Sequence, residues 1–192
     1  DLKAACEQVV LGFTGGEAVE FISVIGVEDE AYGEAYIGDY VYHDEKYEYI
    51  VDSDRLYIRR ISPLSSGISG SLRVGETRAE TEEEAENIGL EVYSKVLSGF
   101  LLEDGGVQIK CQTPEETTYF IEINETVGGI QTGTFAGINI SKSGNLLSAI
   151  FSLGDPENIE RLINDGDKMI SEDEAKQVAL EEAVNRAAEL NA

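Results

Sequence analysis

The residue types that enzymes use for nucleophilic catalysis are sparse in this chain. His43 is the only histidine, so a Ser-His or Cys-His catalytic pair would have to include it. It stands beside Asp44 and Glu45, at what reads as the solvated end of a strand. We therefore predict that His43 is not catalytic and that the protein is not an enzyme.

Carboxylates are abundant, but none stands out as an acid–base pair. The chain has 38 Asp and Glu residues, so two carboxylates close in sequence indicate little. A glycosidase needs two carboxylates that face each other across a cleft, and the chain has no Trp to stack on a sugar. A carboxylate- or metal-dependent hydrolase remains an alternative, which a pocket with converging Asp or Glu side chains would favour.

Residues 165–174 come closest to a metal site. With Glu174 as the last, bidentate ligand of an EF-hand loop, other acidic residues of this stretch fall at ligand positions. However, Ile163 would stand at the first ligand position and Lys168 in place of the invariant glycine. Ser171 and Glu174 also read as the capping box of a helix. We predict no metal and no cofactor.

Composition restricts the partners and the compartment. A formal charge of −24 and an isoelectric point near 4.2 argue against binding nucleic acid or an anionic membrane surface. No apolar run is long enough to span a membrane. Cys6 and Cys111 lack the spacing of metal ligands, and the sequence leaves open whether they are buried thiols or form a disulfide. Because the chain begins at Asp1 and not at Met, we expect a piece of a longer protein.

Tyrosines gather in the first third of the chain, at Tyr32, Tyr36, Tyr40, Tyr42, Tyr47, Tyr49 and Tyr57. On an exposed sheet, tyrosine offers the rigid amphipathic contact area that binding surfaces use. We therefore predict a binding face formed by Tyr36, Tyr40, Tyr42, Tyr47 and Tyr49. The alternative is that these rings pair across strands and stabilise the sheet.

The elements that must position these residues follow from hydrophobic periodicity. Helical spacing predicts helices over 2–12, 81–97 and 171–189, with Gly12 ending the first and a Thr81–Glu84 capping box opening the second. Alternation of apolar and polar residues predicts strands over 18–27, 34–42, 47–51, 56–61 and 107–111.

Residues 119–153 read as the centre of the fold, a meander of three further strands. Gly128-Gly129 and Ser143–Asn145 supply the tight turns. On the last strand, alternation places Leu147, Ala149, Phe151 and Leu153 on the core face.

Two sequence matches share one separation. The helix start at Thr81 resembles the one at Ser171 (171 − 81 = 90), and the hairpin at Ile50 resembles the one at Ile140 (140 − 50 = 90). Together they indicate an internal repeat of one helix and about four antiparallel strands.

The predicted fold is therefore α+β, with two tandem units, each a helix packed on an antiparallel sheet of about four strands, plus a C-terminal helix. The units would occupy residues 1–61 and 80–155, joined by a Ser- and Gly-rich linker at 62–79. C-terminal helices at 156–192 would follow and could open a third unit.

These motifs resemble a known family. Ser171–Ala179 has the form Ser-Glu-x-Glu-Ala-x-x-x-Ala, which is similar to the opening helix of PepSY-type domains. Four further segments resemble the strand half of the PepSY-like YcdB/YcdC repeats of Gram-positive bacteria. They are Tyr119–Ile123, Gly129-Ile130, Gly137–Ser141 and Gly144–Leu147. The chain is also similar to the extracytoplasmic regulators that restrain the cell-wall histidine kinase of those bacteria. The resemblance covers residues 80–180 by motif and 1–61 by architecture.

The resemblance implies a secreted or envelope-anchored, non-catalytic module. PepSY-like units occur in peptidase propeptides, which inhibit or chaperone the peptidase, and in membrane-associated regulators. We expect an extracytoplasmic binding or regulatory module of a bacterial envelope protein, whose partner is an envelope protein such as a peptidase or a sensor kinase. A propeptide-like inhibitor or chaperone of a peptidase is the second hypothesis, although the chain has no His-Glu-x-x-His motif of its own.

Overall fold

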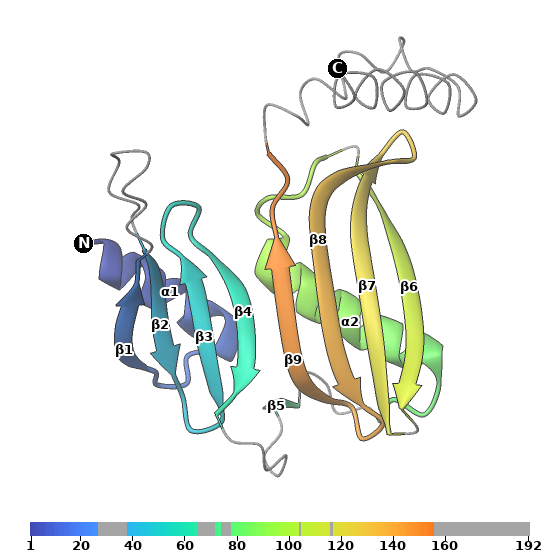
Figure 1. The fold of residues 1–192 in the computed structure, drawn as a ribbon, viewed down its shortest axis with the longest axis horizontal. Helices are drawn as coiled ribbons and strands as arrows, with labels where there is room; N and C mark the ends of the chain where they lie inside the picture. Colours follow the sequence, from blue (N-terminus) through green and yellow to red (C-terminus); the bar gives the residue numbers. More distant parts are fainter. Residues whose placement is uncertain (27–37, 65–71, 74–77, 104, 116, 156–192) are drawn as a thin grey trace, which may run out of the picture. The chain divides into compact units, whose positions relative to one another are not determined.

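The computed structural model describes residues 1–26, 38–64, 72–73, 78–103, 105–115 and 117–155. In chain order these residues form α1 (Leu2–Thr14), β1 (Glu20–Ile25), β2 (Asp39–His43), β3 (Tyr47–Asp52), β4 (Tyr57–Pro63), β5 (Leu72–Arg73), α2 (Glu82–Leu97), β6 (Gly106–Glu115), β7 (Thr118–Val127), β8 (Ile130–Ser141) and β9 (Asn145–Ser152) (Figure 1). The predicted C-terminal helices and the stretch at 165–174 lie outside the described residues.

The strands form one antiparallel sheet in the order β1-β2-β3-β4-β9-β8-β7-β6, with β5 pairing with β9 beside this path. The first four strands make one meander and the last four make another. The two meanders join where β4 meets β9, with Arg60 opposite Ile150 and Ile61 opposite Ala149.

The prediction of two tandem helix-on-sheet units with a C-terminal helix is therefore wrong. The described residues belong to one compact unit, Asp1–Asp155, through which a single sheet runs. The physical reason is that β4 and β9 would each be an edge strand in a separate sheet, with unpaired backbone N–H and C=O groups. Their pairing satisfies those groups and lets Ile61 and Ala149 share one core.

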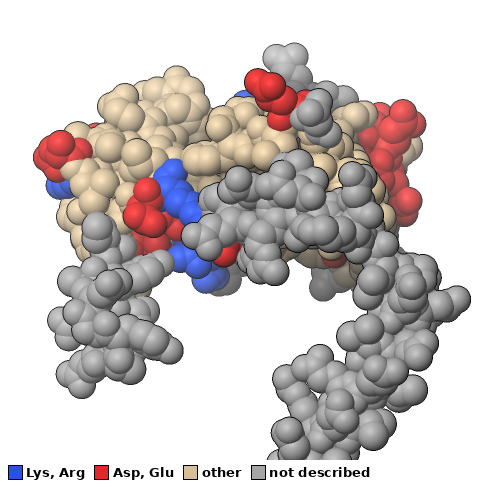
Figure 2. All heavy atoms as spheres, turned by 90° about the horizontal axis from the view of Figure 1, so that it is seen from above, with Lys and Arg blue, Asp and Glu red and all other residues tan. Residues whose placement is uncertain are grey.

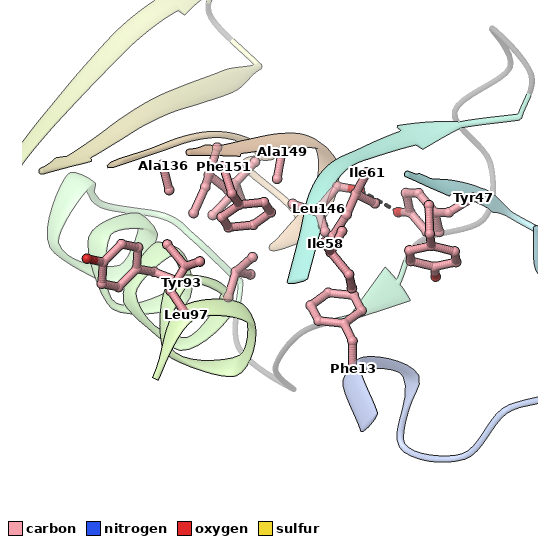
Figure 3. Close-up of a cluster of buried hydrophobic side chains, with 14 of the residues drawn as sticks. Phe13, Tyr47, Ile58, Ile61, Tyr93, Leu97, Ala136, Leu146, Ala149 and Phe151 are labelled. Atoms are coloured by element: carbon pink, nitrogen blue, oxygen red, sulfur yellow. Dashed lines mark hydrogen bonds between the residues drawn. The ribbon is translucent and has the colours of Figure 1, made fainter. Parts of the chain in front are cut away.

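Both helices cover the same face of the sheet (Figure 1). α1 packs against β2, β3 and β4, and α2 packs against β6, β7, β8 and β4. Their apolar side chains meet in one cluster that contains Phe13 from α1 and Leu97 from α2, with Tyr47, Ile61 and Leu146 from the sheet (Figure 3). None of the helices in the described part of the chain has the length and apolar content that crossing a membrane requires.

The helix ends follow local chemistry. The predicted capping box of α2 is confirmed, because Thr81 Oγ1 accepts from the Glu84 amide at 3.2 Å and Glu84 Oε2 accepts from the Thr81 amide at 3.0 Å. The predicted end of the first helix at Gly12 is wrong. α1 continues to Thr14, and Gly15 ends it with a left-handed φ of 75°, a conformation that glycine adopts without steric cost.

The central meander is confirmed with one correction of register. Gly128, Gly129 and Gly144 have the positive φ angles that tight turns need. On β9, however, the buried residue at the start of the strand is Leu146, and Leu147 is only half-buried. The pairing with β8 shifts between Asn139 and Ile140, and this bulge reverses the side-chain alternation at that point.

Candidate functional site

The predicted tyrosine face is buried beneath α1. The exposed fractions of Tyr42, Tyr47 and Tyr49 are 0%, 3% and 0%, so these side chains do not form an interaction surface. Tyr40 is half-buried, and Tyr36 lies outside the described residues. For Tyr42, Tyr47 and Tyr49 the prediction is corrected, because these side chains belong to the core beneath α1, whose position the sequence pattern could not give.

These tyrosines instead pair with one another and with phenylalanine, as the alternative interpretation held. Tyr42 lies opposite Tyr49 in the ladder, and the ring centroids of Tyr47 and Tyr49 are 6.3 Å apart. Their hydroxyl groups are engaged: Tyr42 donates to the Lys3 carbonyl at 2.7 Å, and Tyr49 donates to the Asp44 carboxylate at 2.5 Å. Burial raises the pKa of Tyr42 to about 12 and also raises the pKa of Tyr49.

The histidine and the two cysteines, whose side chains are of types that catalyse reactions, lie in surroundings typical of structural residues. His43 Nε2 lies 3.2 Å from Glu48 Oε2, across the β2–β3 ladder. Cys6 and Cys111 are free thiols, and burial raises the pKa of each. A raised pKa keeps a thiol protonated and unreactive. Within the described ranges, no group of three or more His, Cys, Asp or Glu side chains is placed to hold a metal ion.

A buried carboxylate that sequence reasoning missed lies at the other end of the core. Glu125 is 1% exposed. Its Oε1 accepts from the Leu102 amide at 2.8 Å and its Oε2 from the Thr132 hydroxyl at 2.7 Å. The hydroxyl of Tyr93 is buried nearby and has no hydrogen-bond partner among the described residues, and the Glu125 charge adds to the burial that raises the pKa of Tyr93. Because donors occupy both of its oxygens, Glu125 ties the segment after α2 to the sheet.

The face of the sheet opposite α1 and α2 is called the open face here. The strand pairings align one row of residues across it: Ser23, Val41, Ile50, Arg60, Ile150, Gly137, Glu122 and Lys110. The row runs through both meanders, and its exposed part excludes Val41, which is only 2% exposed.

Arg60 lies at the centre of this row, where β4 meets β9. Its side chain is exposed, and its neighbours in the row are the half-buried Ile50 and Ile150, which is 47% exposed. Among the described residues, the hydrogen bond formed by its guanidinium is to Ser62 Oγ at 2.8 Å. Arg60 thus places a positive charge on an apolar background, and none of the described carboxylates forms an ion pair with it.

Two carboxylates elsewhere on the first meander contact basic side chains. Asp39 forms an ion pair with Arg59 at 2.9 Å, and Glu48 contacts His43. Burial raises the pKa of the Asp39 carboxyl group, and the Arg59 charge opposes that rise. Figure 2 accordingly shows basic side chains beside acidic ones at this end of the molecule, between broad uncharged areas.

The apolar surface beside Arg60 continues onto the second meander. Gly137 has no side chain, and the side chains of Phe120 and Ile150 converge over it, since a Cβ atom there would lie 3.3 Å from both. Phe120 therefore extends the apolar area from β9 toward β7. We call Ile50, Arg60, Phe120 and Ile150 the central patch.

Comparison with known proteins adds no family assignment. No family model matches the chain, no curated protein is significantly similar to it, and no solved structure matches it. The resemblance to PepSY-like repeats therefore stays a hypothesis that rests on the capping, strand and turn motifs of the sequence.

Proposed function

We propose that this protein is a non-catalytic binding module that docks a protein partner against the open face of its sheet, outside the cytoplasm. The observation that carries the proposal is the exposed guanidinium of Arg60 between Ile50 and Ile150. Arginine and aromatic residues on an apolar background dominate the energetics of protein interfaces. A carboxylate on the partner would pair with Arg60 in two parallel hydrogen bonds.

The open face has the dimensions of an interface. Eight paired strands spaced by about 4.8 Å span roughly 34 Å, which accommodates a patch of the usual size for one partner, about 800 Å². Helices cover the other face, so a partner can reach the sheet from one side without displacing either helix.

The non-catalytic character is supported by the surroundings of the reactive groups. His43 contacts Glu48, Glu125 accepts from two donors, and both thiols are held protonated. The extracytoplasmic location and an envelope protein as partner rest on the resemblance to PepSY-like repeats alone. A peptidase and a sensor kinase are the two partner classes that the resemblance implies.

Site-specific photo-crosslinking tests the proposal. A photoreactive amino acid at Ile150, incubated with an envelope extract of the source organism, should give a discrete adduct that mass spectrometry can identify as a peptidase or a kinase. The same group at Asn87, which is exposed on α2, should not give it. Arg60→Glu should weaken capture about tenfold, a loss of about 1.4 kcal/mol. Equal adducts at both positions, or an unchanged yield with Arg60→Glu, would contradict docking on the open face.

A further inference from the structure

The two edge strands of the sheet differ in how well they are protected against pairing with a further strand. Among the described strands, the sheet ends at β1 on one side and at β6 on the other. β6 contains Lys110 and Pro114, which are residue types that prevent a further strand from pairing. β1 has the sequence EFISVI, with neither Lys nor Pro. Both edges carry a bulge, so the bulge does not distinguish them.

Three exposed apolar side chains lie on β1, and two further ones of the first meander, Leu56 and Leu64, lie outside its strands. Ile22, Val24 and Ile25 are 44%, 47% and 50% exposed. Val24 lies opposite Tyr40 on the helix-covered side, whereas Ile25 lies opposite Asp39 on the open side. The end of β1 is therefore apolar on both faces, and a strand added to its outer edge would cover side chains on both.

The other end of β1 is held firmly. The ring of Phe21 lies 6.0 Å from that of Tyr40 and 5.7 Å from that of Tyr42, and Lys3 lies over its face at 4.0 Å. The segment Ser23–Ile25 thus extends from a fixed anchor. An edge that is already ordered loses little conformational freedom when a partner strand pairs with it.

We propose that the outer edge of β1 binds an extended segment of a partner protein as an additional strand, and that this segment alternates apolar and basic residues. Backbone hydrogen bonds supply such pairing, and alternate side chains supply its specificity. The charge of the occupant follows from a net charge of −24 and from the exposed Glu17 and Glu20 beside the strand. A second copy of this chain would instead bring two strongly acidic surfaces together. This site is separate from the central patch and does not depend on it.

A synthetic peptide that alternates lysine and valine serves as the probe. Fluorescence anisotropy at low ionic strength should show binding, and amide hydrogen exchange should slow in β1 but not in β6. A version of the peptide that is N-methylated at alternate residues keeps its charge but cannot pair with a strand. Its affinity should be at least about tenfold lower.

Two matched variants separate strand addition from general attraction. Ile25→Lys and Val107→Lys each add one positive charge on an edge strand, at a side chain that is about half exposed, 50% and 45% respectively. Ile25→Lys should weaken peptide binding about tenfold, and Val107→Lys should leave it nearly unchanged. Similar melting temperatures will show that both variants are folded. Equal effects of the two variants, or equal affinity of the N-methylated peptide, would overturn the proposal.

Discussion

The hydroxyl group of Tyr47 donates a hydrogen bond to the backbone carbonyl of Leu146 at 2.5 Å, within the core (Figure 3). Tyr47 belongs to β3 and Leu146 to β9, 99 positions later in the sequence. The bond therefore connects the two meanders at a second place, beside the ladder between β4 and β9. It links strands that are not neighbours in the sheet.

Tyr47→Phe should destabilise the protein by about 1–3 kcal/mol, because the Leu146 carbonyl loses its buried donor. Tyr93→Phe is the matched control, since the Tyr93 hydroxyl is buried and no group in the described part of the chain forms a hydrogen bond with it. Its removal should be neutral or stabilising. Urea unfolding followed by circular dichroism measures both, and equal losses would show that the Tyr47 bond contributes no net stability.

Two helical glycines should respond to alanine in opposite ways. An added Cβ at Gly12 meets no atom within 4 Å, whereas at Gly89 it would lie 3.0 Å from Ile121 Cγ2. Gly12→Ala should stabilise the protein by up to about 1 kcal/mol through helix propensity. At Gly89 the same gain is outweighed by overpacking, which costs about 1–3 kcal/mol. Thermal unfolding of the two variants compares them, and a stabilising Gly89→Ala would mean that α2 moves freely away from β7.

Glu125→Ala should destabilise the protein by about 2–4 kcal/mol, because the Leu102 amide and the Thr132 hydroxyl both lose their acceptor. Glu125→Gln keeps one carbonyl oxygen and should cost less. Hydrogen exchange at the Leu102 amide should accelerate most in Glu125→Ala. Unchanged exchange there would show that Glu125 does not hold the segment after α2.

Alkaline pH should destabilise the protein. An unfolded tyrosine ionises near its ordinary pKa of 10.0, whereas folded Tyr42 keeps its proton to a pKa of about 12. The unfolded state therefore releases a proton that the folded state retains, and stability falls as the pH rises from 10 to about 12. Tyr49 and Tyr93 shift in the same direction.

Urea unfolding at about pH 9 and about pH 11 measures this loss. Tyr42→Phe has no phenol to ionise at this position, so it should lose less stability between the two pH values than the wild type does. An identical loss in the variant would show that the Tyr42 phenol does not contribute to alkaline unfolding.

Features encoded within a few residues were predictable from the sequence. The Thr81–Glu84 capping box needs only four consecutive residues, and both of its hydrogen bonds form. The strands of the central meander follow from alternation because one face of each is covered by a helix.

Features that depend on distant pairing were not predictable. No local pattern states that Ile61 will lie opposite Ala149. Bulges also make a prediction wrong when it assigns faces by counting alternate residues along a strand. The match between Ile50 and Ile140 illustrates this, since Ile140 is 0% exposed in the core while Ile50 lies on the open face.

The candidate site could be inferred only in part. Tyrosine is amphipathic, so its abundance indicates aromatic contact area without indicating which face it occupies. Arg60 carried no signal in the sequence, because its importance comes from Ile150, a neighbour contributed by the other meander.

We call the short ladder between β4 and β9 the joint. This joint also determines the order in which the protein folds. The ladder holds two residue pairs, Arg60 with Ile150 and Ile61 with Ala149, whereas the strands within each meander pair with neighbours in the chain. Hairpins close within microseconds, but bringing together positions so distant in sequence carries a larger entropic cost. We expect the two meanders to form first and the joint to close last, as the slow step of folding. Until it closes, β4 and β9 are two exposed edges in one molecule, and the folding intermediate is then most prone to aggregation.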